Sequence, residues 1–427
     1  MNSKFLDRVE KLTSKYPKVI DLSLDRVNRL LSKLDNPHLK LPPVIHVAGT
    51  NGKGSTIAFL YNSLKCAGKK VHVYTSPHLI EVIERFIIAN NQITYKELNS
   101  ALNHCEKINE QEHITQFELL TCIAFLVMSK VEADVTLIET GLGGRLDATN
   151  VIKNPVLTIL TSISLDHADF LGNNLSLIAK EKAGIIKKGI TCISAPQSEE
   201  VKKVLINKCE KSKSKLIICN NRSFFSILKN GFIINGLGDE DYFFPTPSLE
   251  GEHQIINALI AATALILCSE FKVRIEDISN GIKTTYWPGR LEKINTGKIK
   301  KYIPNSTNIW IDGGHNIAGA EAIKNWILSK RIKSIILICG FLRNKDAKDI
   351  LFILKKHIKY IICIPIDNKN SLSENELKNI ASKLKIKSYS KSSLKEALKS
   401  DLILSNSKIL IFGSLYLVGE TMRLNTF

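Results

Sequence analysis

The sequence predicts an α/β protein with two domains, each built on a mostly parallel sheet that helices cover. Two observations support this prediction. Short apolar runs alternate with helix-like stretches in the first part of the chain, and a second alternation of the same kind begins near residue 297. Strands that are separated by helices favour βαβ units and parallel sheets. The length of 427 residues suits two to three domains.

The larger, N-terminal domain is expected to span residues 1–285. Four apolar runs in it are strand candidates: VIHVA, GKKVHVYTS, DVTLIET and PVLTILTSI. The stretch at 117–130 (FELLTCIAFLVMSK) is a strongly apolar helix candidate, which we expect to pack against the sheet.

A linker is expected at residues 286–296, because Pro288 and Gly289 are turn signals and no apolar period crosses them. The smaller domain follows at 297–427. Its strand candidates are IWIDG, SIILICG, YIICIP and KILIFGS, and its helix candidates lie near 317–331, 346–357, 373–385 and 392–401. This order predicts a Rossmann-like, doubly wound domain.

The composition is typical of a globular protein, with 44% hydrophobic and 23% charged residues. No run of 18 residues lacks charge, which argues against a membrane-spanning helix. The first residues have no apolar signal segment, so a cytoplasmic location is expected. The nine cysteines are scattered without a C-x-x-C pair, which favours buried, reduced thiols.

The net charge of +18 is compatible with two kinds of partner, nucleic acids and small anions. The lysines are spread along the chain, and clusters such as KCEKSKSK contain no interleaved aromatic residues. We therefore expect small anionic substrates such as nucleotides, and no nucleic acid or membrane partner.

The strongest local signal is a glycine-rich turn between an apolar strand and an apolar helix, in VIHVAGTNGKGSTIAFL. Glycines let the backbone wrap around phosphate oxygens, and the N–H groups at the helix start attract the anion. Lys53 supplies positive charge, and Ser55 or Thr56 can place a hydroxyl on magnesium. The turn departs from the pattern G-x-x-x-x-G-K-[ST], because Gly54 is inserted before Ser55 and Val47 replaces the first glycine. The first domain is accordingly expected to be P-loop NTPase-like.

Glu139 ends the apolar run DVTLIET. A carboxylate at the C-terminal tip of a strand lies where open α/β sheets bind ligands. Carboxylate oxygens are also the ligands that magnesium prefers, so Glu139 is a candidate metal ligand.

Several longer blocks together resemble one family. They are GTNGKGS, YTSPHLIEVIERF, ETGLGGRLDATN, LTSISLDHADFLG, IAKEKAGIIK, GEHQIINA, WPGR, DGGHN and FGSLYLVG, in order between residues 46 and 419. The sequence resembles the folylpolyglutamate synthases and dihydrofolate synthases, which are relatives of the Mur cell-wall ligases. The resemblance implies an ATP-dependent ligase that phosphorylates a carboxylate of dihydropteroate or a folate, and then joins L-glutamate to it with release of ADP and phosphate.

The resemblance implies a role for residues in both domains. Lys53, His167, Lys182 and Arg290 would act in catalysis. The ATP-binding residues would be Gly49, Thr50, Asn51, Gly52, Lys53, Gly54, Ser55, Thr56, Asn257, Arg290, Asp312 and His315. Arg85, Phe117, Thr121 and Asp147 would line the acceptor site, and Ser414 and Tyr416 would receive the glutamate.

Two Mg²⁺ ions, together with K⁺, are implied beside ATP. The metal ligands would be Ser55, Ser76, Glu139, His167 and Lys182. Taken alone, Lys182 is typical of a charge on a helix surface. In similar enzymes the matching lysine is carbamylated by carbon dioxide and becomes an anionic ligand, which requires a neutral amine and hence a lowered pKa.

Two other functions remain as alternatives at this point. One is a ligase of the same superfamily that adds an amino acid to a UDP-muramyl substrate, and the other is a P-loop ATPase that binds nucleic acid. The sequence does not decide between dihydropteroate and folate acceptors, and a monomer is the default expectation.

Overall fold

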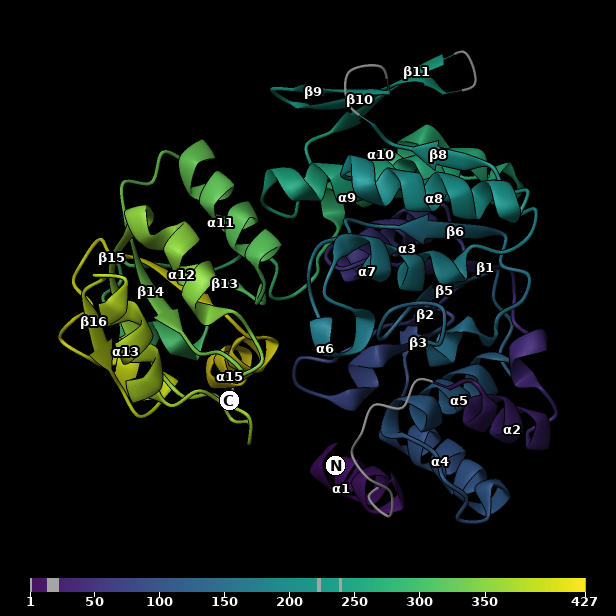
Figure 1. Ribbon diagram of the computed structural model, residues 1–427, viewed down its shortest axis with the longest axis horizontal. Coiled ribbons are helices and arrows are strands. Elements are labelled where there is room, and N and C mark those ends of the chain that lie inside the picture. Colours follow the sequence, from purple (N-terminus) through teal and green to yellow (C-terminus); the bar gives the residue numbers. More distant parts are fainter. Residues whose placement is uncertain (1, 14–22, 221–223, 238–239, 427) are drawn as a thin grey trace. The chain divides into compact units, whose positions relative to one another are not determined.

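The computed structural model describes residues 2–13, 23–220, 224–237 and 240–426. The chain forms two compact units. The first consists of Met1–Ser248 and Ile255–Thr285, and the second of Leu249–Gln254 and Tyr286–Phe427. Figure 1 shows the elements of each unit with their labels.

An eight-stranded sheet, in the order β4-β3-β2-β5-β1-β6-β7-β8, is the centre of the first unit. Six of its strands run parallel: β1 (Val44–Ala48), β2 (Val71–Tyr74), β5 (Val135–Glu139), β6 (Leu157–Leu160), β7 (Cys192–Ser194) and β8 (Leu216–Ile218). Two short antiparallel strands, β3 (Phe86–Ile88) and β4 (Asn91–Gln92), form one edge. The four runs that the sequence predicts as strands correspond to β1, β2, β5 and β6.

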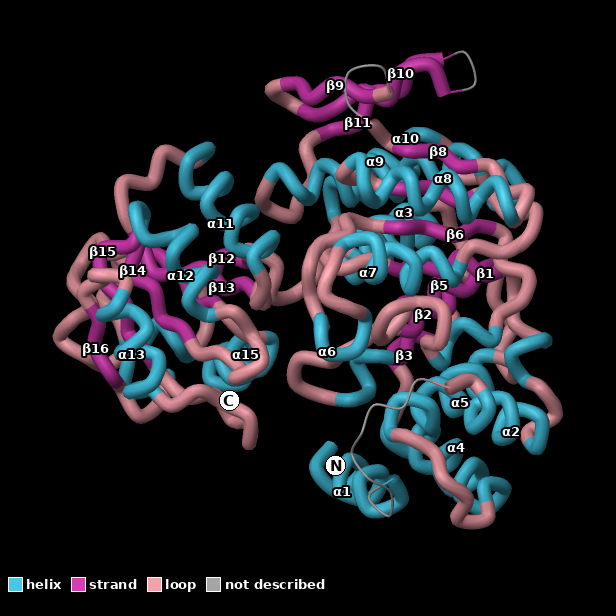
Figure 2. Tube along the Cα trace, viewed as in Figure 1, coloured by secondary structure: helices cyan, strands magenta, loops and turns pink. Residues whose placement is uncertain are grey.

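Helices bury both sides of this sheet (Figure 2). They are α1 (Asn2–Thr13), α2 (Asp25–Lys33), α3 (Lys53–Cys66), α4 (Tyr95–Asn109), α5 (Gln116–Met128), α6 (Ala168–Leu171), α7 (Leu175–Lys182), α8 (Glu199–Lys211), α9 (Glu252–Leu267) and α10 (Ile275–Thr284). One core cluster joins α1, α2, α4 and α5 to Tyr74, Phe86 and Ile138. Another joins α7 and α8 to Ala48 and Leu160. The apolar helix predicted at 117–130 is α5.

A separate three-stranded antiparallel sheet interrupts the first unit between α8 and α9 (Figure 1). Its strands are β9 (Phe225–Leu228), β10 (Gly231–Leu237) and β11 (Glu240–Pro245). Phe232 and Phe244 pack against each other on its buried face, with ring centroids 5.5 Å apart. The sequence-based prediction did not contain this sheet.

The second unit has a six-stranded sheet in the order β12-β13-β17-β14-β15-β16. The parallel strands are β13 (Asn308–Asp312), β14 (Ile335–Cys339), β15 (Ile358–Cys363), β16 (Ser388–Ser390) and β17 (Lys408–Phe412). The helices are α11 (Ile317–Ser329), α12 (Ala347–Leu354), α13 (Glu374–Lys383), α14 (Leu394–Leu398) and α15 (Leu415–Thr426). The α/β class and the parallel character of both sheets are as the sequence predicts.

The segment 286–296, which the sequence predicts as a linker, contains a strand. β12 (Glu292–Ile294) pairs antiparallel with β13 and extends the second sheet at its edge. Residues 249–254, far away in sequence, also belong to the second unit. The indole N–H of Trp326 donates a 2.8 Å hydrogen bond to Glu250 Oε2 and anchors them there.

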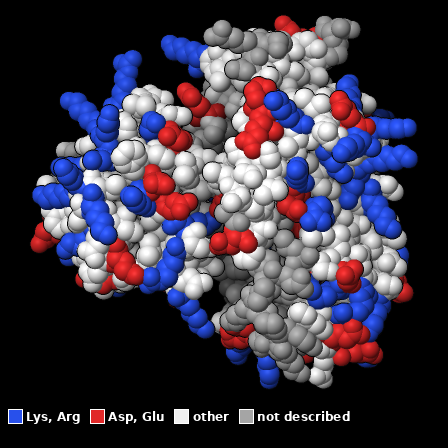
Figure 3. Space-filling model, in the orientation of Figure 1, with Lys and Arg blue, Asp and Glu red and all other residues white. Residues whose placement is uncertain are grey.

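The positive charge is unevenly divided along the chain. Residues 286–427 contain 25 Lys and Arg against 11 Asp and Glu, so most of the net charge of +18 belongs to them. Figure 3 shows many of these side chains on the visible surface. Such a field raises the local concentration of anions. Among the described residues, no helix is both long and apolar enough to cross a membrane.

Candidate active site

The glycine-rich turn joins the end of β1 to the start of α3, as the sequence predicts, and two of its glycines are sterically required. Gly49 and Gly52 have positive φ angles of 151° and 90°. A Cβ on Gly49 would lie 1.8 Å from Thr161 Oγ1, and one on Gly52 would lie 2.3 Å from Asn257 Oδ1. The turn therefore packs directly against Thr161, the residue that follows β6, and against Asn257 of α9.

Hydrogen bonds fix the turn to the segment that follows β6. The N–H of Thr50 donates to Ser162 O at 2.8 Å, and its hydroxyl donates to Ser164 O at 3.0 Å. The N–H of Ser164 returns a 3.1 Å bond to Thr50 Oγ1. The same segment continues to Asp166 and His167, so the turn and these two residues are held by one stretch of chain.

The polar side chains at the start of α3 are placed to meet an anion. Lys53 Nζ donates to the carbonyls of Gly49 and Thr50 at 3.1 and 3.2 Å. The hydroxyls of Ser55 and Thr56 are buried, and within the described part of the chain neither has a hydrogen-bond partner. Buried hydroxyls normally find a partner, so these two are suited to an external ligand.

Lys182 is buried, whereas a lysine at the end of a helix is normally exposed to solvent. It is the last residue of α7, and its Nζ donates a 2.8 Å hydrogen bond to the carbonyl of Gly49. Burial, with the nearby charge of Lys53, lowers the pKa of Lys182 to about 7. A large fraction of this amine is therefore neutral near pH 7.

The loop that follows β5 packs against the end of α7, which carries Lys182 to the carbonyl of Gly49. A Cβ on Gly144 would lie 2.8 Å from the carbonyl oxygens of Glu181 and Lys182. The N–H of Arg145 donates to Glu181 O at 2.7 Å, and its side chain forms an ion pair with the Glu181 carboxylate. The GLGGR sequence thus allows the close approach that buries Lys182.

Glu139 is buried at the end of β5, and its Oε2 accepts a 3.2 Å hydrogen bond from the N–H of Ser76. His167 is exposed, has a φ of 54°, and donates its backbone N–H to Asp166 Oδ1 at 2.9 Å. The charge of Asp166 raises the pKa of Lys182, against the larger effect of burial.

Among the described residues no three His, Cys, Asp or Glu side chains gather as a metal cluster. The predicted metal set would depend on serine hydroxyls and on Lys182 as well.

Phe117 and Thr121 of α5 lie together with Tyr74, an aromatic residue that was not predicted to belong to the site. Tyr74 stacks on Phe117, with ring centroids 6.2 Å apart and an interplanar angle of 20°. Its hydroxyl lies 3.3 Å from Thr121 Oγ1. Burial is the main cause that raises the pKa of Tyr74, and the charge of Asp147 raises it further. The charge of Arg85 lowers it. Two of the four predicted acceptor residues, Phe117 and Thr121, therefore contact Tyr74. Arg85 and Asp147 lie near enough for their charges to act on it.

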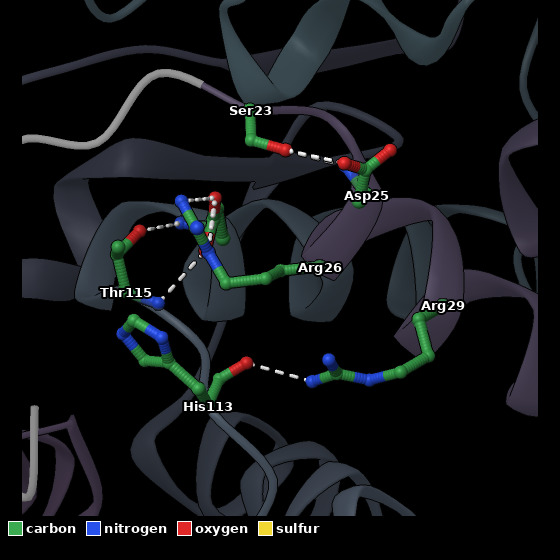
Figure 4. Close-up of polar contacts among 7 residues, drawn as sticks. Ser23, Asp25, Arg26, Arg29, His113 and Thr115 are labelled. Carbon is green, nitrogen blue, oxygen red and sulfur yellow. Dashed lines mark hydrogen bonds and ion pairs between the residues drawn. The ribbon is translucent and has the colours of Figure 1, made fainter.

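A buried ion pair fixes the start of α5 beside this cluster (Figure 4). Arg26 of α2 donates to both carboxylate oxygens of Glu118, with Nε–Oε2 3.0 Å and Nη2–Oε1 2.9 Å. Glu118 also accepts the N–H of Thr115 at 2.8 Å, which completes a capping box. Arg26 and Glu118 are both buried, so the pair orients the helix turn that carries Phe117.

Three predicted nucleotide residues lie in the second unit. Asp312 is buried at the end of β13 and accepts the N–H of Gly314 and of Leu291 at 2.7 and 2.9 Å. His315 Nδ1 lies 2.9 Å from Gly313 O. A Cβ on Gly313 would lie 3.5 Å from Arg290 Nη1, which places this arginine over the same turn.

His253 lies near this group, as the effects of Asp312 and Arg290 on its pKa show, although no sequence motif predicts a role for it. Burial lowers the pKa of His253, while Asp312 raises it and Arg290 lowers it. The last two predicted residues follow β17. Ser414 is buried and accepts the N–H of Tyr416 at 3.1 Å, whereas Tyr416 is 50% exposed.

Comparison with known proteins shows to which family the chain belongs. The Mur ligase middle domain matches residues 47–265, and the dihydrofolate synthetase C-terminal domain matches residues 295–424. A probable dihydrofolate synthetase of Schizosaccharomyces pombe is 35% identical over 423 residues, which cover 95% of this chain and 98% of the relative. The chain belongs to the folylpolyglutamate synthase/dihydrofolate synthase family.

Solved members of this family have the same fold. Escherichia coli FolC in complex with DHPP and ADP superimposes with a TM-score of 0.87 at 27% identity, over 99% of this chain and 97% of that one. A bifunctional folylpolyglutamate synthase/dihydrofolate synthase with Mn, AMPPNP and L-glutamate bound superimposes with a TM-score of 0.84 at 26% identity, over the same shares of the two chains. Family membership makes this protein a ligase.

Proposed function

We propose that this protein uses ATP to join L-glutamate to the carboxylate of dihydropteroate, of a reduced folate, or of both. The observation that carries the proposal is the set of groups at the glycine-rich turn. Lys53 Nζ and Lys182 Nζ both donate hydrogen bonds to the carbonyl oxygen of Gly49. The turn also leads to the buried hydroxyl of Ser55, and the neighbouring strand β5 ends at Glu139. The relatives' names and bound molecules, which include dihydrofolate synthetase, DHPP with ADP, and L-glutamate, support this choice of substrates.

The proposed roles follow the resemblance. Residues 1–285 form the ATP-binding domain and residues 297–427 the ligase domain. The turn from Gly49 to Thr56, with Asn257, binds the phosphates of ATP, and Arg290, Asp312 and His315 contribute to nucleotide binding. Ser414 and Tyr416 receive the glutamate. Arg85, Phe117, Thr121 and Asp147 bind the acceptor, and the stack of Tyr74 on Phe117 supports an aromatic ring there.

The donor set fits a divalent ion. Ser55 Oγ is buried and has no partner among the described residues, and Glu139 offers carboxylate oxygens at the end of the strand next to β1. We propose two Mg²⁺ ions held by Ser55, Ser76, Glu139, His167 and carbamylated Lys182, with K⁺ as a further ion. Bound magnesium would supply positive charge between the phosphates and the acceptor carboxylate.

The first step is phosphoryl transfer. An oxygen of the acceptor carboxylate attacks the γ-phosphorus of ATP, and ADP leaves. Lys53 and the N–H groups at the start of α3 stabilise the negative charge on the transferred group, because donors aimed at developing charge lower the barrier most. His167, Lys182 and Arg290 complete the proposed catalytic set.

The second step forms the amide. The amino group of glutamate attacks the acyl carbon of the acyl phosphate, and phosphate leaves with the oxygen that the carboxylate contributed. No protein nucleophile is needed in this sequence, since the acyl phosphate is already the activated species. Exclusion of water would protect that intermediate from hydrolysis.

The nine cysteines are free thiols, eight of them buried, which supports a proposed cytoplasmic location. We also propose that the protein acts as a monomer, which its elution volume in size-exclusion chromatography at assay concentration would test.

The test is ADP release by the purified protein with ATP, Mg²⁺ and L-glutamate. Dihydropteroate, a monoglutamyl tetrahydrofolate and a UDP-muramyl acceptor are offered separately, and the products are identified by mass spectrometry. Turnover with the first, the second or both names the activity. Turnover with the muramyl acceptor alone, or ADP release that depends on nucleic acid instead of an acceptor, would refute the proposal.

A further inference from the structure

Three buried side chains form a hydrogen-bonded chain between β1 and the loop after β5. His46 of β1 lies with its Nε2 2.9 Å from Thr149 Oγ1. The hydroxyl of Thr149 donates to Asp147 Oδ1 at 2.5 Å. His46 and Thr149 are fully buried and Asp147 nearly so. The contact of Asp147 with Thr149 is local, because Asp147 caps the short 3-10 helix Ala148–Val151, whereas the contact of His46 with Thr149 joins residues 103 positions apart.

The direction of each hydrogen bond follows from counting protons. The hydroxyl of Thr149 has a single proton, which it donates to the carboxylate, so it must accept from His46. Neutral His46 therefore carries its proton on Nε2, and its buried Nδ1 has no partner in the described part of the chain. Burial, with the charge of Lys187, lowers the pKa of His46 to about 3, which keeps the ring neutral at physiological pH.

The carboxylate at the end of this chain is fixed on both oxygens. Oδ1 also accepts the N–H of Thr149 at 3.0 Å, and Oδ2 accepts the N–H of Leu142 at 2.7 Å. Burial raises the pKa of Asp147, while these hydrogen bonds lower it. The donors therefore decide both how the carboxylate is oriented and how well it keeps its charge.

We propose that His46 and Thr149 are positioning residues, which hold the Asp147 carboxylate in the orientation that receives the aromatic ring of the acceptor. The proposal rests on the proposed function, which assigns Asp147 to that site. A carboxylate only accepts hydrogen bonds, so its partner would be a heteroaromatic ring with N–H or amino donors, stacked beside Phe117. Since β1 runs from His46 directly into the turn at Gly49, the chain also fixes this carboxylate relative to the ATP site.

The direct test compares Thr149→Val, which keeps the shape but removes the hydroxyl, with Thr149→Ser, which restores it. The Michaelis constants for acceptor, ATP and glutamate and the melting temperature are measured for each. We expect Thr149→Val to raise KM for the acceptor about tenfold, because a charge-assisted hydrogen bond is lost at a buried carboxylate, with KM for ATP unchanged. Thr149→Ser should retain the acceptor KM.

The matched control is Thr136→Val on β5. Thr136 is as deeply buried, but its hydroxyl has no hydrogen-bond partner among the described residues, so the same substitution should leave all three Michaelis constants unchanged. If Thr149→Val does not fold, a comparison of His46→Gln with His46→Leu tests the positioning role instead. A glutamine can place an N–H where the ring has Nε2, whereas leucine cannot, so only His46→Leu should weaken acceptor binding.

The outcomes separate this proposal from the proposed function. Wild-type turnover with a pteridine acceptor but an unchanged acceptor KM in Thr149→Val, or an equal rise in the constants for acceptor and ATP, would overturn the positioning role alone. Absence of turnover with any pteridine acceptor in the wild type would overturn the proposed function and this inference with it.

Discussion

Substituting Lys182 by methionine removes the buried amine but keeps a side chain of similar length and an apolar stem. A lysine with an ordinary pKa of about 10.5 would be neutral in about one molecule in a thousand at pH 7.4, whereas a pKa of about 7 makes most of the molecules neutral. Only the neutral amine attacks carbon dioxide, so burial raises the reactive fraction by about three orders of magnitude. Lys182 is therefore suited to carbamylation, and we expect Lys182→Met to lose nearly all ligase activity.

The carbamate can be observed directly. Purified protein in ¹³C-bicarbonate with Mg²⁺ should give a carbamate resonance in the wild type and none in Lys182→Met. The resonance and the activity should both fall as the pH drops through about 7, where the amine becomes protonated. Lys180→Met is the matched control, because Lys180 lies on the exposed side of the same helix and its substitution should leave both signals intact. A wild type without the resonance at saturating bicarbonate, or an active Lys182→Met, would refute the reasoning.

Three further predictions concern other parts of the site. Gly141→Ala should raise KM for the acceptor and not for ATP, since its Cβ would lie 2.5 Å from the ring of Phe117; equal effects on both constants in steady-state assays would contradict this. Arg26→Met should lower the free energy of unfolding by about 3 kcal/mol in urea titrations, because it leaves the buried Glu118 carboxylate without its charge partner; a loss below about 1 kcal/mol would show that the pair is not important for stability. Ser55→Ala should abolish magnesium-dependent ATP turnover without lowering the melting temperature, because the hydroxyl it removes has no partner in the described protein; a strongly destabilised variant would assign Ser55 to folding instead.

Much of the fold and of the nucleotide turn can be predicted because the signals are local. The turn is encoded within a few residues, where glycine, lysine and hydroxyl spacing has a direct physical meaning. The strands β1, β2, β5 and β6 are visible as uninterrupted apolar runs, because parallel strands are buried on both faces. Helix ends are less sharp. Asn257, a predicted ATP-binding residue, lies inside α9, which begins at Glu252, more than one turn earlier.

The features that the local sequence does not show are contacts between distant parts of the chain. Nothing near Lys182 in the sequence shows that it is buried, because its partner Gly49 is 133 residues away. The contact of His46 with Thr149 spans 103 residues, and Tyr74 meets Thr121 across 47. Such pairs follow from strand order and loop approach, which apolar periodicity alone does not determine.

The small sheet of β9 to β11 had a local signal that the prediction did not use. Asn230 and Gly231 lie between two short apolar runs, and the dipeptide Asn-Gly is a turn signal. In the structure Leu228 pairs with Gly231, so Lys229 and Asn230 form the two-residue turn and Gly231 is the first residue of β10. The strand β12 is different, because its three residues are too few to show a period and it forms only by pairing with β13.

The central claim is that the acceptor carboxylate is activated by transfer of the γ-phosphoryl group before glutamate attacks. The most direct measurement uses dihydropteroate or a monoglutamyl folate whose reacting carboxylate is labelled with ¹⁸O, and determines the isotopic mass of the phosphate released with ADP. Transfer through an acyl phosphate predicts one labelled oxygen in each phosphate, together with a product heavier by one glutamyl group. Glutamate-dependent product formation with unlabelled phosphate would contradict the account.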